Sequence, residues 1–262
     1  MEFYKYSGSG NDFIMLDDRN GEVKFSAQNI AQWCDRRFGI GADGVILVGA
    51  SAQHDFSMRI INSDGTEAEM CGNGARCSVH FAYNVLGLNK SKKFSFNTMN
   101  GVYAGELLED DLVKIEMTEL FDVESVDVSD FSSKNAMYLN TGVPHTVIQV
   151  NTIDDVSVKS VGSAIRHDSR FKGGSNVCFF DVVKGEEQTV RLRVYERGVE
   201  DETLCCGTGV MATAVACSKF FGWKGEVKVY AKGGELSAVV GDDLSKLFFC
   251  GKVKNIFSGK LF

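Results

Sequence analysis

The sequence predicts an α+β fold of two homologous halves, each rich in strands and wrapped around one central helix. Apolar and polar residues alternate in two short runs, residues 56–62 and 190–196, as expected of strands buried on one face. Each run is followed by a Cys-Gly-x-Gly turn that opens a helical pattern. Glycine occurs 28 times and proline once, a balance typical of many short strands joined by turns.

Local matches that recur in the same order along the chain indicate the two halves. Residues 71–74 (Cys-Gly-Asn-Gly) match residues 206–209 (Cys-Gly-Thr-Gly) at an offset of 135. Two further pairs match at nearly the same offset: residues 9–13 with 141–145, and residues 37–43 with 170–176. Such agreement indicates a duplicated unit in which strands precede one main helix.

We expect an N-terminal half over residues 1–120, which contains Cys71, and a C-terminal half over residues 121–262, which contains Cys206. The join is expected near residues 115–136, and the last strands can cross back to the first half. Pseudo-symmetry would bring the two Cys-Gly-x-Gly turns face to face. We therefore expect the active site between the halves.

Each of these two cysteines is predicted to stand at the start of a helix. The first N–H groups of a helix lack partners within it, and the helix dipole adds partial positive charge. A thiolate is stabilised there, so the pKa of the thiol can fall below its usual value. Glycines let backbone N–H groups approach an anion closely. Two such turns would hold one carboxylate between two thiols, of which one removes an α-proton and the other returns a proton on the opposite face.

A single turn of this kind favours a plain helix entry with a buried cysteine, whereas the symmetric pair favours function. An acid stands four residues before each cysteine, Glu67 and Glu202, which strengthens that interpretation. Cys205 is adjacent to Cys206, and the alignment selects Cys206, so Cys205 is expected to serve packing. The other cysteines fit small buried hydrophobic residues: Cys34, Cys77, Cys178, Cys217 and Cys250.

Composition and charge narrow the class of partner. The net charge of −7 and the pI of about 5.2 disfavour nucleic acid, which requires clustered Lys and Arg. No apolar run reaches the roughly eighteen residues of a membrane span, and the start lacks a signal-peptide pattern. We expect a cytoplasmic protein with free thiols and no membrane partner. The four histidines are scattered and no Cys-x-x-Cys occurs, so no metal site is expected, and the partner is a small substrate.

At residues 71–76 (Cys-Gly-Asn-Gly-Ala-Arg) and 195–198 (Tyr-Glu-Arg-Gly) the sequence resembles the diaminopimelate epimerase family. Members interconvert L,L- and meso-diaminopimelate in the synthesis of lysine and peptidoglycan precursors. The resemblance covers nearly the whole chain; its other segments are residues 10–13, 39–44, 62–65, 142–145, 176 and 202–209. It implies the fold of that family, catalysis without pyridoxal phosphate or metal, diaminopimelate as substrate and a possible homodimer.

The resemblance also implies roles for individual residues. Cys71 and Cys206 would be the two acid/base groups. The reacting carboxylate would be held by backbone at Gly72, Asn73, Gly207 and Thr208. Polar groups at the distal end of the substrate would be held by Asn11, Asn62, Asn176 and Arg197. Glu196 and His145 would lie close to the reacting centre. Amides and a guanidinium suit a second carboxylate and ammonium, although any one Asn can instead be a turn residue.

Two positions depart from the commonest family pattern, because many members have Gln where this chain has Gly44 and Asn where it has Val143. Each change removes an amide that could contact the distal end. Relatives of the same fold racemise proline or hydroxyproline, but the Asn set with Glu196 and Arg197 favours a longer, doubly charged substrate. A non-catalytic thiol redox or ligand-binding protein is the alternative from a different class. Exchange of solvent deuterium into an amino acid would distinguish an epimerase or racemase from a non-catalytic protein.

Overall fold

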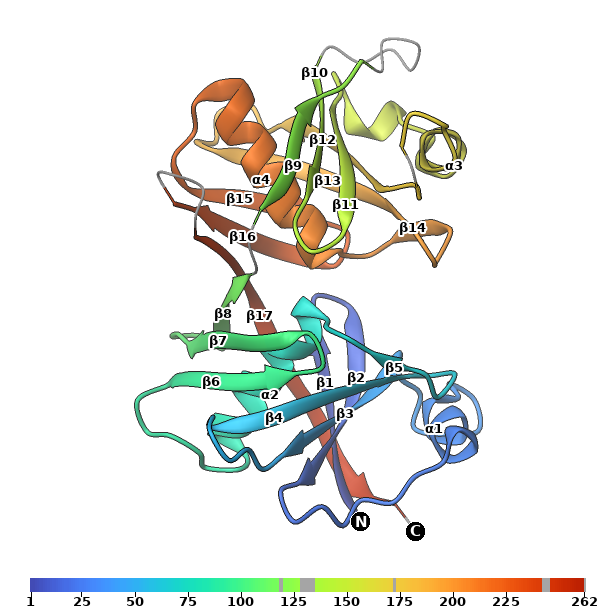
Figure 1. Cartoon of the computed structure of the whole chain (residues 1–262), viewed down its shortest axis with the longest axis vertical. Helices are drawn as coiled ribbons and strands as arrows, with labels where there is room; N and C mark the ends of the chain where they lie inside the picture. Colours follow the sequence, from blue (N-terminus) through green and yellow to red (C-terminus); the bar gives the residue numbers. More distant parts are fainter. Residues whose placement is uncertain (118–119, 128–134, 172, 242–245, 262) are drawn as a thin grey trace. The chain divides into compact units, whose positions relative to one another are not determined.

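The computed structural model describes residues 1–117, 120–127, 135–171, 173–241 and 246–261 (Figure 1). By its internal contacts the chain divides into unit 1, Met1–Glu116 with Gly251–Phe262, and unit 2, Met117–Cys250. Part of the expected join, residues 118–119 and 128–134, lies outside the described residues. No helix in the described part of the chain is long and apolar enough to span a membrane.

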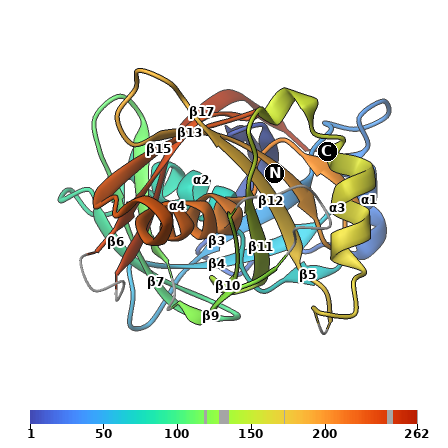
Figure 2. The same cartoon turned by 90° about the horizontal axis from the view of Figure 1, so that it is seen from above.

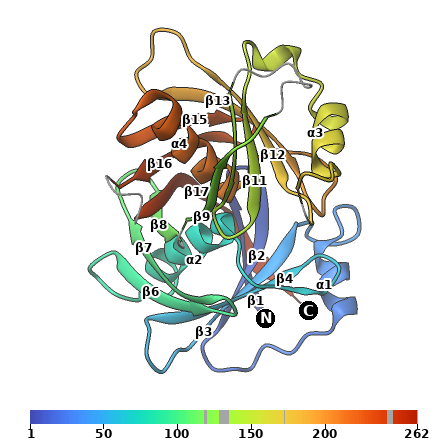
Figure 3. The ribbon, with the colours of Figure 1, turned by 45° about the horizontal axis from the view of Figure 1, so that its top comes forward.

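Unit 1 consists of strands around a buried helix, α2 (Gly72–Asn84) (Figure 3). Its strands are β1 (Glu2–Gly8), β2 (Asn11–Asp18), β3 (Gly44–Gly49), β4 (Phe56–Asn62), β5 (Glu67–Ala68), β6 (Lys93–Thr98), β7 (Gly101–Leu107) and β8 (Leu112–Met117). The pairs β2–β3 and β4–β6 are parallel, and β1–β2, β3–β4 and β6–β7 are antiparallel. Helix α2 packs against β1, β2, β3, β4 and β7, which explains why it is buried along most of its length.

Unit 2 has the same plan around α4 (Gly207–Phe221) (Figure 2). Residues 209–217 of this helix are all buried. Its strands are β9 (Phe121–Ser125), β10 (Asn135–Asn140), β11 (Pro144–Gln149), β12 (Asn176–Val182), β13 (Thr189–Glu196), β14 (Asp201–Thr203), β15 (Gly225–Ala231) and β16 (Gly234–Val240). Helix α4 packs against β10 to β13 and β16. It ends at Gly222, whose φ of 70° is the left-handed conformation that glycine adopts without strain.

The long strand β17 (Leu247–Lys260) begins in unit 2 and continues into unit 1. There it pairs antiparallel with β1, from Gly8 opposite Val253 to Glu2 opposite Lys260. A chain end paired in this way becomes part of the sheet of unit 1.

The predicted strands at residues 56–62 and 190–196 are confirmed as β4 and β13, and the predicted helices as α2 and α4. The structure adds two shorter helices that the sequence analysis missed, α1 (Ala27–Cys34) and α3 (Val158–Arg166), besides the 3-10 turn η2 (Ile153–Asp155). Helix α1 begins with a capping box between Ser26 and Asn29. Each short helix contributes apolar residues to a core cluster of its own unit.

The strand registers of the two units repeat each other. In unit 1, Gly44 is the partner of Phe13 in the parallel pair β2–β3. In unit 2, Asn176 is the partner of His145 in the parallel pair β11–β12. Gly44 therefore occupies the place of Asn176, whereas the sequence match placed Asp43 there. The correction matters because a shift of one residue along a strand moves a side chain to the other face.

The acids before the two cysteines form ion pairs across neighbouring strands. The Glu67 carboxylate accepts hydrogen bonds from Arg59 Nε and Nη2 at 2.8 and 3.0 Å. The Glu202 carboxylate accepts hydrogen bonds from Arg193 Nε and Nη2, both at 2.7 Å. These acids hold β5 against β4 and β14 against β13, so they do not support a catalytic interpretation of the cysteines.

The fate of the other cysteines agrees with their expected role as small buried hydrophobic residues. Those at five positions are buried: Cys34, Cys77, Cys178, Cys217 and Cys250. Cys205 is partly exposed, in contrast to Cys206 beside it.

Candidate active site

Cys71 and Cys206 each occupy the N-cap of the central helix of their unit, as the sequence predicted. Both residues have extended backbone, with φ and ψ of −144° and 118° for Cys71 and −122° and 109° for Cys206. No acidic side chain lies in the first turn of either helix. The first N–H groups of each helix, including those of Gly72 and Gly207, have no partner within the helix and can attract an anion.

Two of the predicted binding residues surround Cys71 in unit 1. Cys71 Sγ lies 3.6 Å from Asn11 Oδ1, which also accepts a hydrogen bond from Asn73 Nδ2 at 3.4 Å. Asn73 is buried, and its Oδ1 accepts a hydrogen bond from Arg76 Nη2 at 2.6 Å. The predicted residue Asn62 is instead exposed at the end of β4, where its amide donates to Thr66 Oγ1 at 3.1 Å.

A charged network that the sequence analysis missed holds Asn11. The Asn11 amide donates to Asp43 Oδ2 at 2.5 Å, and Asp43 accepts a further hydrogen bond from Arg36 at 2.8 Å. Arg36 also pairs with both carboxylate oxygens of Asp12, which forms an ion pair of 2.7 Å with the buried Lys5. These cations hold the pKa of Asp12 down at about 2, against the effect of burial. The sequence signal was that Asp12 and Asp43 lie in segments that resemble the family and that match the second half of the chain.

In unit 2, Cys206 Sγ lies 3.4 Å from Thr208 Oγ1. Burial raises the pKa of the Cys206 thiol well above its usual value, and the nearby Glu196 raises it further. The hydroxyl of Thr208 and the backbone N–H of Gly209 oppose this shift but do not reverse it. The sequence-based expectation of a lowered thiol pKa at the helix start is therefore wrong for Cys206, because burial outweighs the helix terminus.

Two predicted site residues of unit 2, Glu196 and His145, are also perturbed by burial. The pKa of the Glu196 carboxyl is raised by burial, although the Thr203 hydroxyl opposes the shift. The pKa of His145 is lowered to about 3 by burial and by the positive charge of Arg197, so the imidazole is neutral near pH 7. His145 Nδ1 lies 3.5 Å from the sulfur of Cys178, a buried neighbour that the sequence analysis assigned to packing.

Asn176 and Arg197 are brought together at the adjacent ends of β12 and β13. Asn176 Oδ1 accepts a hydrogen bond from the backbone N–H of Arg197 at 2.7 Å. The exposed Arg197 guanidinium donates to Gly173 O at 3.2 Å. Asn176 thus fixes the turn from which Arg197 extends, and further donors of the guanidinium can serve a carboxylate.

Comparison with known proteins identifies the family. The family model described as "Diaminopimelate epimerase" matches residues 3–121 and 137–256. The chain belongs to the diaminopimelate epimerase family. A diaminopimelate epimerase of Aquifex aeolicus is 38% identical over 278 residues, covering 100% of this chain and 98% of the relative. One of Flavobacterium psychrophilum is 44% identical over 220 residues, covering 82% and 81%.

Solved structures share the fold at much lower sequence identity. A phenazine biosynthesis protein of the PhzF family from Bacillus anthracis has a TM-score of 0.78 and 13% identity, covering 100% of this chain and 99% of its own. A hydroxyproline epimerase from Agrobacterium vitis has a TM-score of 0.68 and 13% identity, covering 99% and 91%. The predicted α+β fold is therefore confirmed as the fold shared by these epimerases and PhzF proteins.

Gly44, the first departure that the family resemblance implied, is packed closely against the neighbouring strand. A Cβ atom at Gly44 would lie 2.6 Å from the backbone oxygen of Ile61 on the paired strand β4. A larger side chain there requires β3 and β4 to separate. Val143, the second departure, is half-buried just before β11, and its backbone oxygen accepts a hydrogen bond from Thr141 N at 3.2 Å.

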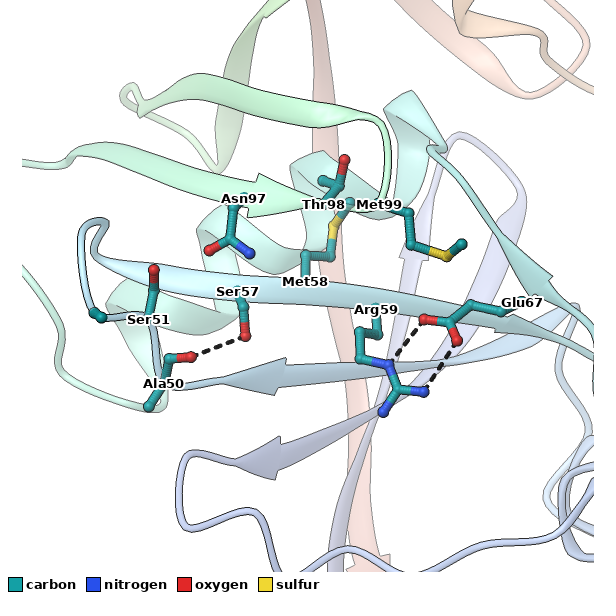
Figure 4. A pocket seen from close by; sticks show the side chains of 10 residues that line it. Ala50, Ser51, Ser57, Met58, Arg59, Glu67, Asn97, Thr98 and Met99 are labelled. Atoms are coloured by element: carbon teal, nitrogen blue, oxygen red, sulfur yellow. Dashed lines mark hydrogen bonds and ion pairs between the residues drawn. The ribbon is translucent and has the colours of Figure 1, made fainter.

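None of the residues that line a pocket of about 430 Å³ in unit 1 is a predicted site residue (Figure 4). Its lining includes the ion pair between Arg59 and Glu67, together with Asn97 and Met99. None of its lining residues is a thiol or another strong nucleophile. The helix N-caps are thus the stronger candidates for the catalytic centre.

Proposed function

We propose that this protein epimerises diaminopimelate, interconverting the L,L and meso isomers by proton transfer between two cysteines. The observation that carries the proposal is the repeated helix N-cap cysteine, one in each unit, in a chain that belongs to the diaminopimelate epimerase family. The enzyme is accordingly an isomerase that acts in the biosynthesis of lysine and peptidoglycan precursors.

In this mechanism one cysteine thiolate removes the α-proton and the other cysteine thiol donates a proton to the opposite face of the same carbon. Negative charge develops beside the α-carboxylate as the proton leaves. Backbone N–H groups at Gly72, Asn73, Gly207 and Thr208 stabilise that charge in this proposal, because the first N–H groups of a helix have no partner within the helix itself. This chemistry needs neither pyridoxal phosphate nor a metal ion.

The two cysteines need opposite protonation states for the reaction to proceed in either direction. The raised pKa of Cys206 supports this requirement, since it favours a protonated thiol at neutral pH. Two thiolates at short range would repel each other and couple their titrations. We assign Glu196, whose charge raises the pKa of this thiol, and the neutral His145 to the surroundings of Cys206.

The distal end of diaminopimelate carries a second ammonium and carboxylate, which this proposal assigns to amides and one guanidinium. The residues are Asn11, Asn62, Asn176 and Arg197. The contact between Asn176 and the backbone of Arg197 supports their joint role. The homodimer and the cytoplasmic location expected from the sequence stay predictions.

The test is incorporation of deuterium at the α-carbon in D₂O, read by mass spectrometry with L,L- and meso-diaminopimelate and with proline side by side. The parent should label and invert diaminopimelate. Cys71→Ala and Cys206→Ala should each lower epimerisation by roughly 10²-fold or more, since each removes one acid/base group. Any residual exchange without inversion should favour opposite isomers in the two variants.

Cys205→Ala is the matched control, because it removes a neighbouring thiol that the repeat does not select, and it should behave like the parent. An inactive Cys205→Ala beside an active Cys206→Ala would refute the assignment of the second cysteine. Labelling of proline but not of diaminopimelate would favour a racemase of the same fold. If no amino acid is labelled, the result would favour the alternative of a non-catalytic thiol redox or ligand-binding protein.

A further inference from the structure

Two amide side chains beside Cys71 are each oriented by a charged group. Arg76 donates to Asn73 Oδ1 at 2.6 Å, so the Asn73 Nδ2 faces Asn11 Oδ1 at 3.4 Å. Asn11 Nδ2 donates to Asp43 Oδ2 at 2.5 Å, so its Oδ1 faces Cys71 Sγ at 3.6 Å. A guanidinium can only donate and an ionised carboxylate can only accept. If either amide turned over, like groups would face each other.

We propose that Asp43 is a positioning residue for Cys71. Asp43 holds the carbonyl of Asn11, rather than its NH₂ group, toward the sulfur of Cys71. Asp43 precedes β3 and Asn11 begins the parallel neighbour β2, so the sheet brings the two side chains together. The catalytic meaning of this role rests on the proposed function, whereas the orientation of the amide does not.

Asp43 is itself held firmly for a side chain that is 42% exposed. Its carboxylate accepts hydrogen bonds from Arg36 Nη2 at 2.8 Å and from the backbone N–H of Asp12 at 3.1 Å. The backbone N–H of Asp43 in turn donates to the backbone oxygen of Asp12 at 2.9 Å. Lys5 completes the network through its ion pair with Asp12, so two cations balance two carboxylates.

The orientation of Asn11 has a chemical consequence for the thiol. A carbonyl oxygen accepts a hydrogen bond from S–H and so favours the protonated form, whereas an NH₂ group would favour the thiolate. By fixing the carbonyl toward the sulfur, Asp43 raises the pH at which Cys71 becomes reactive. The ionisable and charged groups of unit 1 near this point include Lys5 on β1, Asp12 on β2, Arg36 after α1, Asp43 before β3, and Arg76 and Cys77 on α2, and the proposed function adds Cys206.

The decisive variant is Asp43→Asn, which keeps the shape but supplies an amide that can donate or accept. Asn11 is then free to turn over. The readout is the rate of alkylation of Cys71 by iodoacetamide as a function of pH, from mass spectrometry of the peptide that carries Cys71. We expect the midpoint of this profile to move to lower pH by about one unit.

Two comparisons separate orientation from charge. Asp12→Asn removes the same charge from the same network but leaves the Asp43 carboxylate in place, so its midpoint should stay near that of the parent. In an Asn11→Ala background, Asp43→Asn should no longer move the midpoint. The proposal is overturned if Asp12→Asn shifts the midpoint equally, if the shift persists without Asn11, or if Asp43→Asn causes no shift.

A measurement on the parent covers the case in which Asp43→Asn does not fold. The Asn11 side-chain N–H₂ and the backbone N–H of Asp12 donate to the same oxygen of Asp43. Their protons should therefore show a nuclear Overhauser effect, with Asn11 signals assigned from the Asn11→Ala spectrum. Contacts of the Asn11 N–H₂ only with the β-protons of Cys71 would overturn the proposal.

Neither measurement uses a substrate, so the outcome is independent of the epimerase assignment. A shifted alkylation profile in a protein that labels no amino acid would refute the proposed function alone. An unshifted profile in an active epimerase would refute the role of Asp43 alone.

Discussion

The sulfur of Cys178 lies 3.5 Å from Nδ1 of His145, and both side chains are fully buried in unit 2. His145 also receives the field of Arg197, and together with burial this lowers its pKa to about 3. A neutral imidazole therefore lies beside Cys178, whose own charge is one cause of the raised pKa of Cys206.

The buried imidazole should make the free energy of unfolding depend on pH. His145 is neutral in the folded state down to about pH 3, but it takes up a proton near pH 6.5 once unfolded. The unfolded state thus binds more protons between these values, so stability is lost as pH falls from about 6.5 toward 3, by at most about 1.4 kcal/mol per pH unit.

Urea denaturation of the parent and of His145→Gln at pH 7 and pH 5 measures this contribution. The difference in the free energy of unfolding between the two proteins should shrink as pH falls, because only the parent loses the contribution of His145. Carboxylates contribute equally to both proteins and cancel in this difference. His54→Gln, which removes a histidine outside the core, should retain the pH dependence of the parent. A His145→Gln variant with the same pH dependence as the parent would show that the imidazole does not stay neutral.

Glu196 should hold Cys206 in its thiol form. Its carboxylate is one cause of the raised pKa of Cys206, because a nearby negative charge disfavours a thiolate. Glu196→Gln should move the pH midpoint of Cys206 alkylation downward, as measured by peptide mass spectrometry. Glu200→Gln, which removes a carboxylate paired with Arg166 in the same unit, should leave the midpoint in place. Equal effects of both variants would contradict a specific role for Glu196.

Arg197→Lys should lower kcat/KM for diaminopimelate by roughly ten- to a hundredfold, while the melting temperature stays equal to that of the parent. Lysine keeps the charge but loses the planar fork that binds a carboxylate through two parallel hydrogen bonds. Arg170→Lys is the control, since Arg170 pairs with Asp168 elsewhere in unit 2, and its kcat/KM should equal that of the parent. A fully active Arg197→Lys would remove Arg197 from the binding site.

Gly162→Ala should destabilise the protein although alanine favours helices. A Cβ atom at Gly162 in α3 would lie 2.5 Å from Cβ and 2.7 Å from Cγ of Tyr195 on β13. Separating the helix from the strand should cost about 1–3 kcal/mol in urea denaturation. Ser160→Ala, at an exposed position of the same helix, should change the free energy of unfolding by less than about 0.5 kcal/mol. A Gly162→Ala variant with the same free energy of unfolding as the parent would show that α3 does not pack tightly against Tyr195.

The elements predicted well from the sequence were those with a local signal. The alternation in residues 56–62 and the Cys-Gly-x-Gly turns specify strands and helix starts through neighbouring residues alone. The short helices α1 and α3 were missed, because eight or nine residues give little periodicity beyond a cap such as Ser26. The sequence match that equated Asp43 with Asn176 was off by one residue, because hydrogen bonds between strands fix the register and place Gly44 there.

The sequence by itself determined the duplicated plan, the family and the place of Cys71 and Cys206 at helix N-caps, because these depend on patterns along the chain. Only the tertiary structure decided how each thiol is held. Cys206 is buried beside Glu196, which raises its pKa, whereas Cys71 faces an amide that Asp43 orients from a neighbouring strand. Burial and charge act through space, between residues that are distant in sequence, so no local pattern records them.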